Sequence, residues 1–475
     1  MHGLSADRLP EAIAEPISAP EFSARLDPLM DPGSGPVAVA VSGGADSTAL
    51  LHLADAWARK HARPLLVYTV DHRLRPDAAD EALRVACLAA TLGRSHRTLA
   101  WVGDKPSTGL QAAARTARYR LLLAACRRDR AEALLLAHHL DDQAETLLHR
   151  IDRGTGPDGM AGMQPARRLD GVLLLRPLLD LPKARLVATC RAAGLAWSED
   201  PSNDDRRFAR TGLRRLAPAL AEAGITPDRL GRLAAAMAVA RATLDRFAAA
   251  WMAAHADVRA AGDLRLDRAA LLAAAPTLRH RLVDHALRAV GGAAYPARGA
   301  RLARLLEWIA AAGSGSSVRT LGGCRVTCDG GEVLIVRDWR GAAPPVVVGP
   351  RDTGRWDGRF DIDNPTDAPV RVGVCGEEGW RRWRRRTAGT PAAATPAGLP
   401  AVSHAARLAL PAVVDLDGGI VLPHLVPSAL TPSGWVGDAV RIRFRPSVSL
   451  PSLDRCLGAG NEYRPSLPCN GRQAT

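Results

Sequence analysis

Cysteine, lysine and long hydrophobic runs are all scarce in this chain of 475 residues. The eight cysteines are spread along the chain without a dense framework, which argues against a disulfide-stabilised secreted protein and favours a reducing compartment. No uninterrupted apolar run reaches the roughly 18 residues that a membrane-spanning helix needs. The N-terminus also lacks a basic segment followed by an apolar stretch, so no secretory signal is expected. These absences together predict a cytoplasmic protein.

Lysine occurs only at Lys60, Lys105 and Lys183, and every other basic residue is arginine. The 63 basic and 49 acidic residues give a net charge of +14, which favours an acidic partner such as nucleic acid or phosphate groups. A compositional bias toward arginine would explain the same charge, so charge alone leaves both explanations open. Hydrophobic residues make up 47% of the chain, which is enough for sizeable cores, and the length allows two to four domains.

Short apolar runs alternate with amphipathic stretches over residues 36–218. This alternation predicts an α/β domain with a doubly wound, mostly parallel sheet covered by helices on both faces. The preceding residues, 1–35, are rich in proline and are expected to form a flexible lead-in. The pattern predicts strands at 36–41, 64–70 and 133–139, and helices at 47–60, 77–93 and 110–128.

The second half of the chain has a different composition. Residues 219–340 are rich in alanine, leucine and arginine at helical spacing, and predict a helical domain. That domain is expected to end in a β-hairpin over 320–339 that turns at Asp329-Gly330-Gly331. Residues 341–448 predict a smaller mixed α/β domain, and residues 449–475, rich in proline, serine and glycine, predict a disordered tail.

The segment Ser42-Gly43-Gly44-Ala45-Asp46-Ser47 directly follows the first predicted strand and opens a helix. Glycines let the backbone approach phosphate oxygens, amide groups at a helix start face an anion, and the serines add hydroxyl donors. The segment is neither a Walker A loop nor a G-x-G-x-x-G loop. On these residues alone, a phosphate-binding loop and an ordinary turn with Ser47 capping the helix are equally supported.

This S-G-G-A-D-S segment resembles the signature of the PP-loop, or N-type, ATP pyrophosphatases, which have a Rossmann-like fold. Within that superfamily, further segments resemble the tRNA(Ile)-lysidine synthetases in sequence, order and spacing. These segments are residues 70–82, 111–122, 137–163, 176–186 and 199–218. The match is strong over residues 36–218, partial over the helical region and weak beyond about residue 340.

The resemblance implies a ligase that forms a C–N bond and uses ATP with Mg²⁺. ATP would adenylate the C2 oxygen of the wobble cytidine in the isoleucine tRNA with anticodon CAU. Free L-lysine would then displace AMP through its ε-amino group and leave lysidine, with pyrophosphate as the other product. Two rivals are a thiolation enzyme of the same superfamily, which would use paired cysteines, and a non-catalytic RNA-binding protein with a relic ATP loop. The oligomeric state stays open, with a homodimer as one option.

The resemblance makes three acidic side chains candidate catalytic residues. Asp46, beside the phosphates, would bind them through Mg²⁺, because hard cations prefer carboxylate and phosphate oxygens; its alternative role is to cap the following helix. Asp142 and Glu145 are three residues apart at a predicted helix start and share one face. There they could hold Mg²⁺, orient the ammonium group of lysine or accept its proton, or simply complement the helix dipole. Zinc held by His138 and His139 is less favoured, because a tetrahedral site lacks a clear fourth ligand.

Candidate contacts to ATP come from a helix and a strand end. Gln111, Arg115 and Arg118 fall on one face of a predicted helix. The two guanidinium groups would neutralise phosphate charge during adenylation, with one of the two left unassigned, or they form an ordinary solvated face. Asp71 and His72 end the second predicted strand, at the edge where a doubly wound sheet binds its ligand.

Two arginine clusters are candidate tRNA-binding surfaces. The first belongs to the segment that begins Glu199-Asp200 and consists of Arg206, Arg207, Arg210 and Arg214. In the second, Arg384, Arg385 and Arg386 follow Trp380 and Trp383, which either stack on RNA bases or belong to a core. The glycine-rich residues 153–163 form either a mobile loop over the site or a plain connector.

Overall fold

The computed structural model describes most of the chain in two compact units, Met1–Ala242 and Thr243–Thr475. The predicted domain boundary after residue 218 does not coincide with this division. Within the described ranges, no helix is both long and apolar enough to cross a membrane. The described residues are 14–31, 33–74, 78–106, 108–152, 155–169, 171–198, 216, 218–259, 261–293, 296–313, 317–329, 331–387, 403–414, 420–422 and 440–446.

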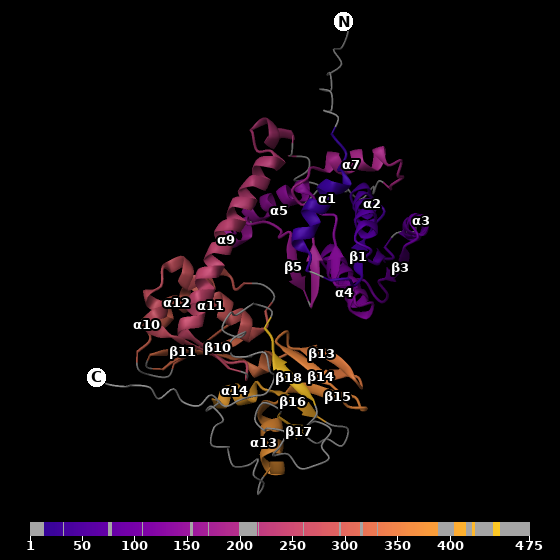
Figure 1. The fold of residues 1–475 in the computed structure, drawn as a ribbon. Helices are drawn as coiled ribbons and strands as arrows, with labels where there is room; N and C mark the ends of the chain where they lie inside the picture. The colour runs from indigo at the N-terminus through magenta and orange to yellow at the C-terminus, as the bar shows by residue number, and fades with distance from the viewer. Residues whose placement is uncertain are drawn as a thin grey trace, which may run out of the picture. The chain divides into compact units, whose positions relative to one another are not determined.

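A six-stranded sheet forms the centre of the first unit (Figure 1). Its strands are β1 (Val37–Ala40), β2 (Leu65–Asp71), β3 (Ser95–Ala100), β4 (Ala133–Leu135), β5 (Ala166–Leu169) and β6 (Val172–Leu175). Their order is β3-β2-β1-β4-β6-β5, and every neighbouring pair is parallel except β5 with β6. The predicted mostly parallel sheet is therefore confirmed, although β3, β5 and β6 were not among the predicted strands.

Helices cover both faces of this sheet. The helices of this unit are α1 (Ala19–Leu26), α2 (Ala45–Lys60), α3 (Ala78–Thr91), α4 (Leu110–Arg128), α5 (Leu140–Asp152), α6 (Pro157–Met160), α7 (Lys183–Ala192) and α9 (Pro227–His255), which continues past the last residue of the unit; a 3₁₀ turn, η1 (Asp27–Leu29), follows α1. Successive residues of β1 point to opposite faces. Val37 and Val39 join the core that contains α2 and α7, whereas Ala38 and Ala40 join the core that contains α4. The doubly wound arrangement follows from this alternation.

Part of the predicted flexible lead-in is an ordered helix. Ser18 caps α1 by accepting a hydrogen bond from the Glu21 amide, and a proline lies in its first turn. Phe22 and Leu26 are fully buried in the core that also contains α2 and α7. The expectation of flexibility is therefore wrong for residues 19–29, whose apolar positions belong to the first unit.

The second unit contains more strands than the sequence predicts. Residues 219–340 were expected to be helical up to a hairpin, yet the strands β7 (Ala256–Val258) and β8 (Leu264–Asp267) interrupt them. The hairpin itself is confirmed, because β10 (Cys324–Asp329) and β11 (Glu332–Arg337) pair with Asp329 opposite Glu332. The elements are β7 (Ala256–Val258), β8 (Leu264–Asp267), α10 (Arg268–Ala273), α11 (Pro276–Gly291), α12 (Gly299–Ala311), β9 (Val318–Leu321), β10 (Cys324–Asp329), β11 (Glu332–Arg337), η3 (Trp339–Gly341), β12 (Val346–Val348), β13 (Asp352–Trp356), β14 (Phe360–Asn364), β15 (Val370–Val374), α13 (Gly376–Thr387), α14 (His404–Leu408), β16 (Pro411–Val414), β17 (Ile420–Val421) and β18 (Arg441–Phe444).

Three antiparallel sheets organise these elements. Their orders are β7-β8-β11-β10-β9, β12-β15-β16-β17 and β13-β14-β18. One hydrophobic core contains residues of all three sheets, from Val258 on β7 to Phe444 on β18. The regions predicted as a helical domain and a separate mixed domain therefore share a core within this unit.

Candidate active site

The loop between β1 and α2 holds the predicted phosphate-binding residues. Gly43 has φ +91°, a conformation that favours glycine, and Gly44 occupies the N-cap position of α2. Ser47 therefore does not cap the helix. Instead, its Oγ accepts a hydrogen bond from the Ser42 amide (3.1 Å) and donates one to the Gly44 carbonyl (3.0 Å). The loop closes around Ser47 at the helix start, where backbone amides without helical partners can bind an anion.

A second segment fixes this loop from outside. The Ser198 amide donates to the Gly43 carbonyl (2.9 Å), and Arg84 of α3 donates to Ser198 Oγ (2.9 Å). Ser198 is the last described residue before the Glu199-Asp200 segment, which lies outside the described residues. The candidate tRNA-binding residues Arg206, Arg207, Arg210 and Arg214 lie outside the described residues.

His139 lies at the centre of the acidic residues that the sequence singles out. It follows β4 and is only 4% exposed. Its Nε2 lies 3.5 Å from Asp46 Oδ2 and 3.4 Å from Asp142 Oδ2, and its Nδ1 lies 3.4 Å from Asp141 Oδ2. Burial alone would lower the pKa of His139, but Asp141, Asp46 and Asp142 outweigh it and raise that pKa to about 10. The charged His139 ring therefore connects Asp46 of α2 with Asp142 of α5 at neutral pH.

The three aspartates around His139 have different surroundings. Asp141 also accepts a hydrogen bond from the Lys183 amide (2.9 Å) at the start of α7, which gives it a structural role. Asp46 lies in the first turn of α2, and its Oδ1 is buried without a hydrogen-bond partner among the described residues. A buried carboxylate oxygen in that state suits a cation.

Asp46 and Asp142 fit the requirements of Mg²⁺. Both offer hard carboxylate oxygens, and both approach the same His139 nitrogen. No group of three or more His, Cys, Asp or Glu side chains within the described ranges is arranged to hold a metal ion. A metal at Asp46 and Asp142 would therefore complete its shell with phosphate oxygens and water, which is the usual binding mode of Mg²⁺ in nucleotide enzymes.

The helix α5 presents Asp142 and Glu145 together, as the sequence predicts. Both side chains are half-buried, and they are separated by about one helical turn. On the apolar side of α5, Ala144 and Leu147 pack against Leu230 of α9. This packing fixes α5 against α9, and the Oε2 atom of Glu145 is buried.

The glycine-rich connector after α5 is tied down over its described part. Gln143 accepts a hydrogen bond from the Met163 amide (2.7 Å) and donates one to the Met163 carbonyl (3.0 Å). Arg150 donates to the carbonyls of Gly159 (2.6 Å) and Gly162 (2.9 Å). Of the two alternatives for residues 153–163, these contacts favour the connector over a mobile loop.

The arginines of α4 differ in what they contact. Arg115 is exposed and stays on its own helix, with its guanidinium 5.1 Å from the Tyr119 ring centroid. Arg118 is half-buried and lies close to His72. The pKa of His72 is lowered mainly by the burial of its own ring and secondly by the positive charge of Arg118. Gln111 is exposed. These contacts favour Arg118 over Arg115 as the guanidinium that faces the carboxyl edge of the sheet.

That edge carries further polar groups. Asp71 ends β2, and its Oδ1 accepts a hydrogen bond from the Arg73 amide (2.8 Å). His72 contacts Trp101 edge to face, with ring centroids 5.9 Å apart. Arg176, which follows β6, is only 6% exposed and donates to the Gln164 carbonyl (2.8 Å). Arg176 was not among the predicted site residues, because an arginine after a short apolar run has no distinctive local pattern.

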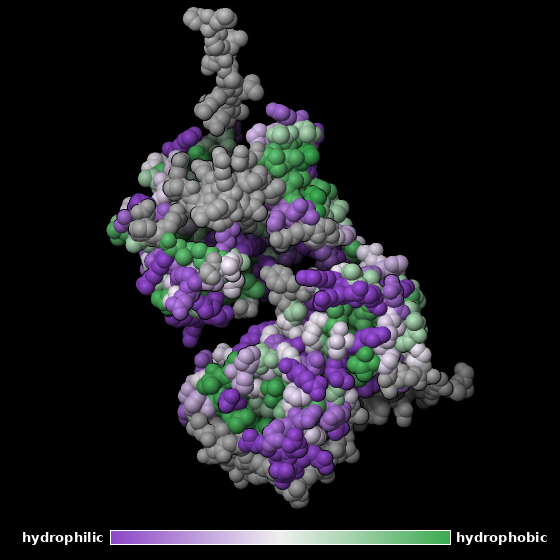
Figure 2. All heavy atoms as spheres, turned by 180° about the vertical axis from the view of Figure 1, so that it is seen from behind, coloured by the Kyte–Doolittle hydropathy of each residue, from purple (hydrophilic) through white to green (hydrophobic). Residues whose placement is uncertain are grey.

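The second arginine cluster lies on α13 in the second unit. Trp383 is buried in a core, and Trp380 stacks on it with ring centroids 5.1 Å apart. Trp383 therefore belongs to the core and the half-buried Trp380 packs against it, which favours the core alternative over stacking on RNA. Arg384 and Arg385 are exposed, whereas the side chain of Arg386 lies outside the described residues. Figure 2 shows hydrophilic surface at the lower end of this unit, where Figure 1 places α13.

Comparison with known proteins places this site in a family. The PP-loop domain family matches residues 19–220. The tRNA(Ile)-lysidine synthase of Methylobacterium sp. (strain 4-46) is 49% identical over 335 residues, which are 68% of this chain and 95% of that protein. The chain belongs to the tRNA(Ile)-lysidine synthase family. The Ruegeria pomeroyi member is 38% identical over 385 residues, which are 80% of this chain and 89% of that protein.

The similarity to the lysidine synthase family extends beyond the PP-loop domain. An alignment of 335 residues is longer than the first unit, so it includes part of the second. Among solved structures, the U34-tRNA thiolase NcsA from Methanococcus maripaludis is similar over a region that covers 45% of this chain and 77% of the NcsA chain. Its TM-score of 0.40 at 14% identity is too low to support a comparison of function with this lysidine synthase family member.

Proposed function

We propose that this chain ligates free L-lysine to C2 of the wobble cytidine in the isoleucine tRNA with anticodon CAU, using ATP. The observation that carries the proposal is the meeting of Asp46 and Asp142 at His139, beside the loop Ser42–Ser47, in a chain of the lysidine synthase family. Because ATP, lysine and tRNA are cytoplasmic, the reaction would take place in the cytoplasm.

In the first step, the C2 oxygen of the cytidine attacks the α-phosphorus of ATP, and the bond to the pyrophosphate oxygen breaks. The loop amides and the hydroxyls of Ser42 and Ser47 are suited to bind the departing phosphates. Arg118, at the carboxyl edge, is suited to neutralise the charge that develops on them. Mg²⁺, when bound by Asp46 and Asp142, would supply further charge neutralisation.

In the second step, the ε-amine of lysine attacks C2, the C2–O bond breaks, and AMP leaves. The ε-ammonium must lose a proton before it can attack. The carboxylates of Asp142 and Glu145 on one face of α5 would attract the ammonium, and a Glu145 oxygen would accept the proton.

The proposal is tested by incubating the full chain with ATP, Mg²⁺, labelled lysine and the isoleucine tRNA with anticodon CAU. Labelled lysine should enter the tRNA, with one AMP and one pyrophosphate formed for each lysine. The same tRNA with uridine at the wobble position is the control and should take up none. Pyrophosphate release without tRNA, or no lysine incorporation with it, would refute the proposal.

Among the α4 arginines, we expect Arg118→Ala to lower kcat for pyrophosphate release about 100-fold. Arg115→Ala on the same helix should lower it only a few-fold, because Arg115 is directed to Tyr119. Both variants remove one positive charge, so a difference between them reports position. Equal losses, or a larger loss at Arg115, would contradict the assignment.

For α13, we expect Arg384→Ala combined with Arg385→Ala to weaken tRNA binding and to lower the slope of log K against log salt by up to about 2. The matched control combines Arg351→Ala and Arg381→Ala, whose guanidinium groups are exposed and paired with Asp367 and Glu378. The control should leave the slope nearly unchanged. An unchanged slope in the first variant would mean that these arginines have no role in RNA binding.

A further inference from the structure

A small basic pocket lies in the second unit, and its lining residues are not among those discussed so far. Its volume is about 170 Å³, and it is formed by the end of α11, the start of α12 and the turn between β9 and β10. Three of the residues that line it are arginines, Arg288, Arg298 and Arg301, and none of them is acidic. The pocket therefore combines a cavity with a concentration of positive charge.

The charges of these arginines are unequally compensated. Arg288 is half-buried and lies 3.8 Å from Asp284, one turn away on α11. Arg298 and Arg301 are exposed, and no ion pair within the described ranges involves either of them. Arg298 and Arg301, at the start of α12, therefore supply positive charge at the edge of the pocket that no carboxylate of the described residues balances.

The size and chemistry of the pocket select a small anion. Ligand pockets for whole organic molecules usually have about 300–1,000 Å³, so this one suits a single group. Arginine forks match the oxygens of a phosphate group better than they match most other anions. The positive end of the α12 dipole lies at the same rim, and a Cβ atom added at Gly299 would meet nothing within 4 Å.

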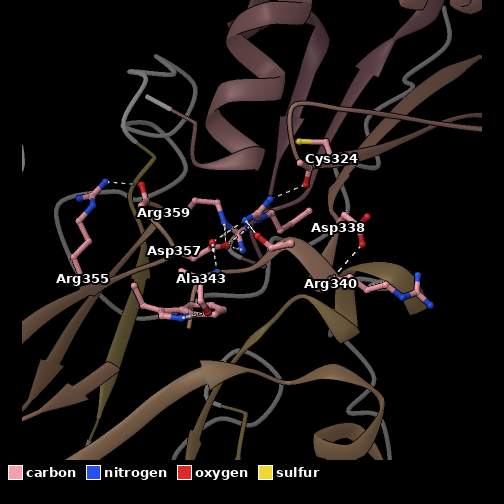
Figure 3. A network of polar contacts seen from close by, with 12 residues as sticks. Cys324, Asp338, Arg340, Ala343, Arg355, Asp357 and Arg359 are labelled. Atoms are coloured by element: carbon pink, nitrogen blue, oxygen red, sulfur yellow. Dashed lines mark hydrogen bonds and ion pairs between the residues drawn. The ribbon is translucent and has the colours of Figure 1, made fainter. Parts of the chain in front are cut away.

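The turn between β9 and β10, which contributes Gly322 to the pocket, is anchored by a buried ion network, shown in Figure 3. Arg337 donates to the Gly323 carbonyl (2.9 Å) in the β9–β10 turn and to both oxygens of Asp357 (2.9 and 3.0 Å). Arg359 donates to the same carboxylate (2.9 Å). A Cβ atom on Gly291 would clash with the Gly322 carbonyl, so α11 and the turn are in direct contact. The α11 and turn side of the pocket is therefore fixed, so that mainly the exposed Arg298 and Arg301 side chains would lose freedom when a ligand binds.

We propose that this pocket binds one phosphate group of the RNA backbone, with Arg298 and Arg301 as its ligands. The inference rests on the proposed function for the identity of the RNA. A free phosphate ion has the same chemistry and is the other source of such a group. The pocket is too small for a whole nucleotide but large enough for one phosphate group. Because the proposed substrate is a tRNA, we take the RNA backbone as the source of that group.

The test compares Arg301→Ala with Arg304→Ala in the full chain. Both residues are exposed on α12, and both changes remove one positive charge, but Arg304 does not line the pocket. We expect Arg301→Ala to weaken tRNA binding about 5-fold and to lower the salt slope by about 1, because one phosphate contact is lost. Arg304→Ala should change binding less than 2-fold. KM for tRNA should rise with Arg301→Ala, while kcat at saturating tRNA stays unchanged.

Equal effects of the two variants would overturn the proposal, because they would show that only net charge matters. Titration with inorganic phosphate separates the two sources of the group. Saturable phosphate binding that Arg301→Ala abolishes, with tRNA binding unchanged, would overturn the RNA assignment. Failure of the wild-type chain to incorporate lysine would refute the proposed function, whereas the pocket is tested by RNA binding alone.

Discussion

Asp46→Asn is expected to reduce ATP-dependent AMP formation about 1,000-fold while changing tRNA affinity less than 2-fold. The substitution keeps the shape of the side chain but removes its negative charge, which faces His139 and which the buried carboxylate, with no hydrogen-bond partner for Oδ1 among the described residues, would offer to a cation. Stabilisation of phosphate charge by a bound cation contributes several kcal/mol, and each 1.36 kcal/mol corresponds to a factor of ten in rate. Pyrophosphate release under single-turnover conditions, together with tRNA binding by filter retention, measures the two quantities separately.

Asp141→Asn is the matched control for this prediction. It makes the same chemical change on the other side of the same imidazole, since Asp141 contacts Nδ1 of His139. Asp141 also holds the Lys183 amide, so its loss should lower stability slightly and activity only a few-fold. If both variants lose activity equally, the effect belongs to His139 rather than to a cation at Asp46. A matching loss of tRNA binding in Asp46→Asn would also contradict the assigned role.

The parts of the first unit that could be predicted are those where burial leaves a local pattern. The central strands β1, β2 and β4 are mostly buried and appear as apolar runs in the sequence. The edge strand β3, Ser95–Ala100, is mostly exposed or half-exposed and has no such run. The strand β6 is fully buried over four residues, as β1 is, so its apolar run was present in the sequence and was missed by the prediction.

In the candidate site as well, relations between residues close in the sequence could be predicted, whereas contacts between distant segments could not. Asp142 and Glu145 share a helix face because of their spacing alone, and the structure has them so. The contact of Asp46 with His139 depends on β1 and β4 being neighbours, which no local pattern specifies. Trp380 and Trp383 show the limit of spacing, because two tryptophans three residues apart suit an RNA-stacking surface and a core face equally well.

The largest expected effect on stability comes from Asp357→Asn in the second unit. The Asp357 carboxylate is 3% exposed and binds two guanidinium groups, those of Arg337 and Arg359, which are 8% and 1% exposed. Removing its charge leaves both cations buried without a counterion, which costs about 3–5 kcal/mol in comparable pairs. Urea unfolding at neutral pH should show this loss in the transition of the second unit.

Asp361→Asn is the control, because Asp361 also pairs with two arginines but is 38% exposed. Surface pairs of that kind contribute about 1 kcal/mol or less.

The pH dependence of the free energy of unfolding gives a second check of the role of Asp357. Burial would raise the pKa of Asp357, but the hydrogen bond from Arg337 and the charge of Arg359 hold that pKa below its ordinary 3.8. Its contribution to the free energy of unfolding is therefore present above about pH 4 and is lost as pH falls through the lower folded-state value. The difference between wild type and Asp357→Asn should accordingly shrink in acid. A difference that stays constant down to pH 3 would mean that shape, rather than charge, makes Asp357 necessary.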